Sequence, residues 1–178
     1  MKHEFDPQHL DVKSFAGAQA HLEGEAPLAQ FARLAQDAEG PAGPVRWRLE
    51  GHTQPVQGGA DEIWVHLTAH AALPLRCQRC LTPVTETVAV AREFRFVPDE
   101  ATAALEDDAS QEDVLALSRD FDALELVEDE LIMALPLVPM HATCPSEHAL
   151  TAKPADDELV EKKPNPFAVL ATLRTPKG

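Results

Sequence analysis

The sequence predicts an α+β fold, with a mainly antiparallel sheet or partial barrel and two or three peripheral helices. Several runs alternate apolar and polar residues with the period of a strand. Two other stretches place apolar residues three and four positions apart, as in an amphipathic helix. The chain has 178 residues and is 44% hydrophobic, which is ordinary for a globular protein with a core. We therefore expect one domain over residues 1–178.

Three predicted strands form the sheet. In residues 45–50, the apolar Val45, Trp47 and Leu49 alternate with charged side chains. Residues 63–75 and 84–96 alternate in the same way, and only a short turn with two cysteines separates them. Two long strands joined by such a turn are typical of an antiparallel hairpin.

Helices are predicted at residues 27–38 and 121–135. The first has Pro27 in its first turn and a Gly-Pro stop after it. The second carries an apolar stripe and ends before Pro136. Residues 10–15 predict only a short strand or edge segment.

Three further segments lie outside this pattern. Residues 99–119 are acidic and poor in bulky apolar side chains, which predicts a solvated, mobile loop. Residues 141–163 have no period and predict an irregular linker. Residues 164–173 begin with a capping Asn165, continue with Pro166 and end in an apolar run. They predict a short C-terminal helix that docks onto the body or onto a partner.

The net charge excludes one class of function. Lys and Arg number 15 against 30 Asp and Glu, which gives a formal net charge of -15. A protein that coats nucleic acid normally has a basic excess, so bulk RNA or DNA binding is disfavoured. Most of the negative charge lies in residues 99–130, whereas residues 74–97 are slightly basic. The sequence has no long apolar run and no basic-then-apolar N-terminus, so we expect a cytoplasmic protein without membrane contact.

The sharpest local motif is the pair Cys77 and Cys80 in the hairpin turn. Two cysteines separated by two residues can present both thiolates to one tetrahedral zinc ion. His141 and Cys144 would complete a set of four ligands, although an acidic segment separates the two halves. A reduced dithiol turn without metal is the alternative. A thiol redox site is a third interpretation, but the sequence leaves no room for the helix that such a site needs.

The usual catalytic motifs are missing from the sequence. It has no nucleophile elbow, P-loop, dinucleotide fingerprint or zinc-protease motif. We therefore expect a binding protein rather than an enzyme, with no small-molecule substrate.

Two charged surfaces are candidate contacts. Arg76 and Arg79 at the hairpin tip are candidates for a narrow contact with RNA or with a partner. The second surface is acidic and lies on the outer faces of the helix at 121–135, where it could attract a basic protein. Solubility alone also explains its charge. Its residues are Glu125, Glu128, Asp129 and Glu130.

Three stretches of the chain, taken in order, resemble the YceD family, the large ribosomal RNA subunit accumulation proteins of bacteria and plastids. They are residues 77–81, residues 126–139 with His141 and Cys144 after them, and residues 163–170. The resemblance implies a cytoplasmic bacterial factor that supports synthesis, processing or stability of the large-subunit (23S) ribosomal RNA. It supplies no catalytic residue.

The resemblance also bears on the cysteines and on the partners. The family's cysteine positions match Cys77, Cys80 and Cys144, which favours zinc. Some relatives have Gly after the second cysteine where this chain has Leu81. Since glycine adopts tight-turn conformations more readily than leucine, we expect backbone strain in this turn. The expected partner is a ribosomal RNA precursor particle, or a basic ribosomal or RNA-processing protein. The alternatives are a zinc-stabilised adaptor with a non-ribosomal partner and a thiol redox protein.

Overall fold

The computed structural model describes residues 5–145, which belong to one compact unit, residues 1–145. Residues 146–178 form a second unit that lies outside the described residues. The C-terminal helix predicted at 164–173 and most of the linker predicted at 141–163 therefore also lie outside them. The account below concerns the first unit alone.

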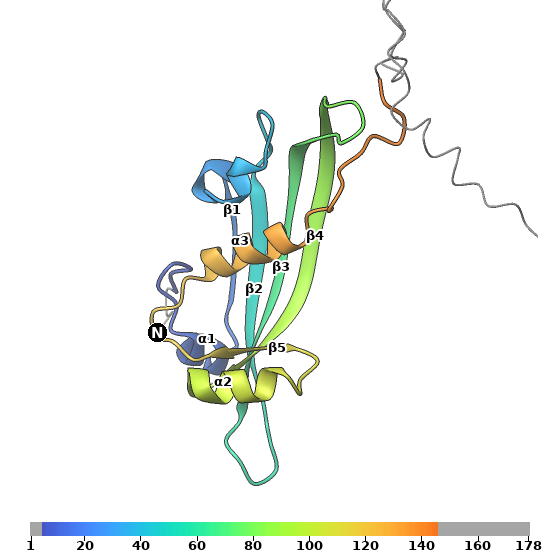
Figure 1. Cartoon of the computed structure of the whole chain (residues 1–178). Coiled ribbons are helices and arrows are strands. Elements are labelled where there is room, and N and C mark those ends of the chain that lie inside the picture. Colours follow the sequence, from blue (N-terminus) through green and yellow to red (C-terminus); the bar gives the residue numbers. More distant parts are fainter. Residues whose placement is uncertain (1–4, 146–178) are drawn as a thin grey trace, which may run out of the picture. The chain divides into compact units, whose positions relative to one another are not determined.

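A five-stranded sheet with the order β1-β2-β3-β4-β5 forms the body of this unit (Figure 1). The strands β1 to β4 pair antiparallel, and β5 pairs parallel to β4. The sheet is open, so the predicted α+β fold with a mainly antiparallel sheet is confirmed. The strands are β1 (His21–Ala26), β2 (Val45–Gln54), β3 (Glu62–Arg76), β4 (Pro83–Val97) and β5 (Asp113–Ala116).

One face of the sheet forms the core. The register places Leu49 beside Leu67 and Val65 beside Phe94, so the apolar sets of neighbouring strands fall on the same face. Helix α3 (Ala123–Met133) packs on this face through Val127 and Leu131. Asp122 caps α3 by accepting hydrogen bonds from the backbone N–H groups of its first turn. The predictions of the hairpin strands and of this helix are confirmed.

The N-terminal prediction at 10–15 is wrong for most of its length. Leu10 forms an isolated bridge with Phe121, and helix α1 (Val12–Gly17) begins directly after Asp11. Asp11 accepts a hydrogen bond from the Ser14 backbone N–H and so starts the helix. Helix α1 packs so closely on β2 that a Cβ at Gly51 would lie 2.6 Å from the ring of Phe15. A larger residue at position 51 would push the helix away.

The helix predicted at 27–38 is replaced by two 3-10 turns, η1 (Leu28–Gln30) and η2 (Leu34–Gln36). The backbone leaves helical geometry at Phe31, and both Phe31 and Leu34 become buried. The carboxylate of Glu128 on α3 accepts hydrogen bonds from the N–H groups of Arg33 and Leu34. A side chain distant in sequence therefore takes N–H groups that a continuous helix would have bonded internally.

The loop predicted at 99–119 is also corrected. It contains helix α2 (Glu100–Asp107), capped by Asp99, and strand β5. Arg95 on β4 pairs with Glu106 and Glu112 from this segment. Because this cation offsets the local repulsion between carboxylates, an acidic segment can fold onto the sheet.

Candidate metal centre

The turn between β3 and β4 is a tight knuckle. The Cys77 N–H donates to the Thr82 carbonyl at 3.0 Å, and the Leu81 N–H donates to the Cys77 carbonyl at 2.9 Å. Leu81 adopts a left-handed backbone with a φ of 61°, a region that glycine occupies more readily. The strained turn predicted at this position is therefore present. It directs Cys77 and Cys80 toward the same side of the hairpin tip.

The chain that follows α3 returns to this tip. Residues 134–145 leave the sheet face and run along the hairpin toward its end (Figure 1). The Gln78 N–H of the knuckle donates to the Pro139 carbonyl at 2.9 Å. This backbone hydrogen bond brings His141 and Cys144 beside the two cysteines of the turn. Residues more than 60 positions apart in the sequence meet here.

The four predicted ligands form one cluster. The sulfur atoms of Cys77, Cys80 and Cys144 and a ring nitrogen of His141 all lie within 4.8 Å of one another. The Cys77 and Cys144 Sγ atoms are 4.0 Å apart, and the Cys80 Sγ lies 3.4 Å from the His141 Nδ1.

These separations fit a metal ion better than a disulfide. Ligands of one tetrahedral zinc ion would be about 3.8 Å apart for two sulfurs and about 3.6 Å apart for sulfur and nitrogen. A disulfide would need a sulfur separation of about 2.05 Å, and all three cysteines are free. The set Cys77, Cys80, His141 and Cys144 could therefore hold a metal ion.

Local hydrogen bonds favour loss of the proton from two of the three thiols, those of Cys77 and Cys80. Burial disfavours the Cys77 thiolate, but hydrogen bonds from the Cys80 backbone and from His141 outweigh it and lower the pKa of Cys77 to about 5. The Thr82 hydroxyl, 3.1 Å from Cys80 Sγ, lowers the pKa of that thiol. The hydrogen bond to Cys77 raises the pKa of His141. By contrast, burial raises the pKa of Cys144.

The knuckle gives no support to thiol redox chemistry of the thioredoxin type. Residues 78–80 form a turn and no helix begins at Cys77, so the helix dipole that lowers a redox cysteine's pKa is missing from this turn. Cys77 is also fully buried, which removes it from attack by a substrate disulfide.

The two predicted arginine contacts at the tip differ from each other. Arg76 is held by Glu39, with Nε 2.6 Å from a carboxylate oxygen. Arg79 is exposed and has no ion pair with any residue in the range 5–145. The tip therefore offers one unpaired positive charge rather than two.

The predicted acidic surface on α3 also needs a correction. Glu128 is only 8% exposed, because its carboxylate is directed inward and binds Arg33 and the backbone N–H of Leu34. Asp129 pairs with Arg33 at 2.5 Å. Burial raises the pKa of Glu130, which is half-buried. Glu125 is thus the one member of the set that is both exposed and free of ion pairs among residues 5–145.

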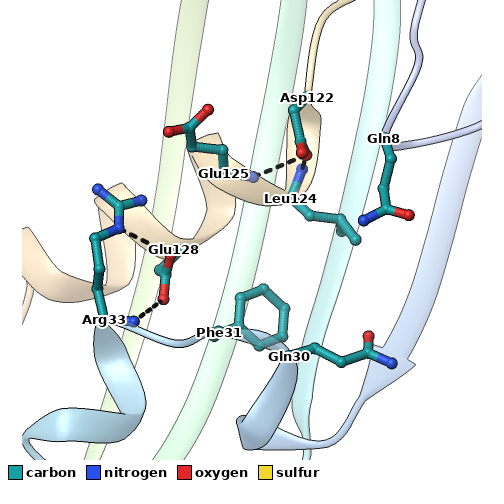
Figure 2. Close-up of a pocket in the computed structure, with 8 residues that line it drawn as sticks. All are labelled: Gln8, Gln30, Phe31, Arg33, Asp122, Leu124, Glu125 and Glu128. Carbon is teal, nitrogen blue, oxygen red and sulfur yellow. Dashed lines mark hydrogen bonds and ion pairs between the residues drawn. The ribbon is translucent and has the colours of Figure 1, made fainter.

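The same region of α3 borders a cavity of about 590 Å³ (Figure 2). Two of its three carboxylates have structural roles: Asp122 caps the helix, and Glu128 holds the segment that contains Arg33. The sequence identified Glu128 as a surface residue and did not reveal its inward structural role. The residues three and four positions before and after it are apolar or acidic, so no local pattern pointed to its partner.

Comparison with known proteins connects this cluster to a family. Residues 65–174 match the family model described as large ribosomal RNA subunit accumulation protein YceD. The match includes β4, α3 and all four residues of the metal centre. The chain belongs to the YceD family. The resemblance found in the sequence is thereby confirmed.

A curated relative supports the YceD assignment. The large ribosomal RNA subunit accumulation protein YceD of Haemophilus influenzae is 38% identical to this chain over 107 residues. The alignment covers 56% of this chain and 59% of the relative, so the chain spans a little over half the length of that relative. No solved structure matches this YceD chain significantly. Within residues 5–145, no helix is long and apolar enough to cross a membrane.

Proposed function

We propose that this protein is a non-catalytic ribosome-biogenesis factor that supports synthesis, processing or stability of the large-subunit (23S) ribosomal RNA. The family match carries the proposal, because it spans the region that builds the metal centre. The protein would act in the cytoplasm by binding a ribosomal RNA precursor particle, or a basic ribosomal or RNA-processing protein.

The metal is proposed to be zinc, and its role structural. Three sulfurs and one imidazole are a donor set that zinc prefers, and four protein ligands leave no open position for a substrate. Cys77 and Cys80 would hold it from the hairpin, and His141 and Cys144 from the returning chain. When bound, the ion would supply a cross-link between these two segments. The proposed role fits a binding protein rather than a hydrolase.

The charge distribution supports a partner that presents both negative RNA and a positively charged protein surface. Coating of bare RNA is disfavoured by the net charge of -15. The exposed Arg79 supplies one positive charge at the tip, and the exposed, unpaired Glu125 supplies negative charge on α3. A basic protein bound beside RNA in a precursor particle offers both complementary charges.

Affinity purification tests the proposal. The tagged full-length protein should co-purify with precursor large-subunit particles, and nuclease treatment should separate the RNA-dependent partners from those bound directly. A variant with Cys80→Ser and Cys144→Ser should lose this association, whereas Ser110→Ala, at a residue distant from the centre, should retain it. Absence of ribosomal proteins and of precursor RNA from the wild-type sample would contradict the proposed function.

A further inference from the structure

Two of the three unpaired cations among the described residues lie together at a second place. Lys13, Arg79 and Arg119 have no ion pair within residues 5–145, and only Arg79 lies at the hairpin tip. The remaining arginines of this range each contact at least one carboxylate; they are Arg33, Arg46, Arg48, Arg76, Arg92 and Arg95. Lys13 and Arg119 line the same cavity. Helix α1, which contains Lys13, lies at the opposite end of the sheet from the β3–β4 turn (Figure 1).

This cationic cavity has a volume of about 310 Å³ and is also lined by Ser14 and Ser118. One carboxylate, that of Asp11, borders it. Asp11 is already engaged as the cap of α1, where it accepts the Ser14 N–H at 3.0 Å. The neighbouring Asp120 pairs with His9 at 2.6 Å. Arg119 also lies close enough to Asp11 to help lower the pKa of that carboxyl. Neither Lys13 nor Arg119 forms an ion pair within residues 5–145, so both side chains can contact an anion.

An apolar cavity of about 450 Å³ adjoins the cationic one and shares two lining residues with it, Lys13 and Leu117. It lies between α1, the β2–β3 turn and the end of β4. Its apolar lining comes from Ile63, Phe96, Val97 and Pro98. Five lining residues are polar or charged, and among them Arg95 is held by Glu106 and Glu112. A cavity of this size with a mainly apolar surface is typical of a small organic ligand or a single planar ring system.

The charged groups at the two ends of the joined cavities differ in sign, so a ligand with one anionic end would bind in one orientation. Asp61 and Glu62 lie on the wall of the apolar cavity beside the β2–β3 turn. Glu62 accepts a hydrogen bond from the Trp64 indole at 3.2 Å, whereas Asp61 is exposed and has no ion pair within residues 5–145. A carboxylate at this place repels a phosphate but accepts hydrogen bonds from the amino group of a nucleobase. The phosphate end and the base end of a nucleotide would therefore be distinguished.

We propose that the two adjoining cavities bind one unpaired nucleotide of single-stranded RNA, with its phosphate between Lys13 and Arg119 and its base in the apolar cavity. The proposal rests on the proposed function, since the family's role in RNA accumulation favours RNA over other anions. A single-nucleotide site also fits the charge of the protein, because it needs two cations instead of a basic face.

Binding of labelled single-stranded RNA from the large-subunit precursor tests this site, with fluorescence anisotropy measured over a series of salt concentrations. Lys13→Gln combined with Arg119→Gln should weaken binding about tenfold and reduce the salt slope by about one. Gly17→Leu should weaken binding without changing the slope, because Gly17 lines the apolar cavity and a Cβ there meets no atom within 4 Å. Arg46→Gln is the matched control, since Arg46 is an exposed arginine on β2 that lines neither cavity. Arg79→Gln tests the hairpin tip as the alternative contact.

The outcomes separate this site from the proposed function. Loss of affinity in the two cavity variants, with Arg46→Gln unchanged, supports the site. Loss with Arg79→Gln alone would overturn it and place the contact at the tip. No RNA binding by the wild type, or stronger competition by an acidic peptide with an apolar side chain than by RNA, would also overturn it. In each case co-purification with precursor particles still decides the proposed function independently. Gly17→Ala and thermal unfolding of every variant control for folding.

Discussion

The two ends of the long β3–β4 hairpin are held in place by different kinds of interaction. Where the hairpin pairs with β2 and packs under α3, buried apolar side chains such as Leu67, Phe94 and Val127 provide the contacts. At its tip, the returning chain is held by one backbone hydrogen bond and a cluster of thiols and imidazole. Leu81 and Leu137 near the tip are exposed, and the buried apolar face of β3 ends at Leu75, just before the turn. The body can therefore fold by hydrophobic burial, whereas the tip needs its ligand cluster.

The largest effect should come from the body. Phe94→Ala removes a buried ring on the core face and should lower the free energy of unfolding by about 3–5 kcal/mol. Leu105→Ala is the control, because Leu105 is 77% exposed and its loss should change stability by less than about 0.5 kcal/mol. Chemical denaturation measures both. Equal effects of the two changes would mean that the assigned core face is wrong.

A smaller effect is expected from the buried carboxylate of α3. Glu128→Ala leaves the N–H groups of Arg33 and Leu34 without acceptors and should cost about 3 kcal/mol. Glu125→Ala, one turn earlier on the same helix and exposed, should be nearly neutral. The same denaturation experiment compares them. If Glu125→Ala were the more damaging change, the inward orientation of Glu128 would be refuted.

Metal removal should act on the tip. Free zinc at about one hundred times its dissociation constant should add about 2.7 kcal/mol to the stability of the folded chain. A chelator should remove this increment and speed hydrogen exchange at the Gln78 amide, which bonds to Pro139. Amides between β2 and β3 should stay protected. Collapse of their protection on chelation would show that the body depends on the metal as much as the tip does.

The smallest effect concerns the left-handed residue of the knuckle. Leu81→Gly relieves a backbone conformation that costs a non-glycine residue about 1 kcal/mol, so zinc should bind about fivefold more tightly. Gln19→Gly is the control, because Gln19 also has a positive φ but lies outside the centre. Competition with a chelator of known affinity measures the change. Weaker zinc binding by Leu81→Gly would show that the Leu81 side chain supports the closed turn.

Sequence periodicity predicted the parts of the fold that are decided locally. The alternation in β3 and β4 and the stripe of α3 identified their buried faces, because each pattern repeats over enough residues to define one face. Strand β1 was missed, since its burial pattern is weak and Leu22 is only half-buried. The acidic segment with α2 was predicted as a loop because its stabilising cation, Arg95, lies on another strand.

For the candidate site, the sequence identified the ligand residues but not the tertiary contacts that bring them together. The spacing of Cys77 and Cys80 indicated a metal pair, and His141 and Cys144 were identified as the possible completing ligands. The sequence could not show that these halves meet, because their contact depends on the path of α3 across the sheet. It also could not reveal that Glu39 forms an ion pair with Arg76, or that Lys13 and Arg119 line the same cavity. Such pairings depend on tertiary contacts alone.

Zinc X-ray absorption, combined with metal analysis of the purified full-length protein, tests the central claim most directly. We expect one zinc ion per chain, bound by three sulfurs at about 2.3 Å and one nitrogen at about 2.0 Å. His141→Ala should replace the nitrogen by a water oxygen or abolish binding. A protein purified without zinc that also fails to take it up, or a bound ion without sulfur ligands, would contradict the proposal that zinc joins the hairpin tip to the chain after α3.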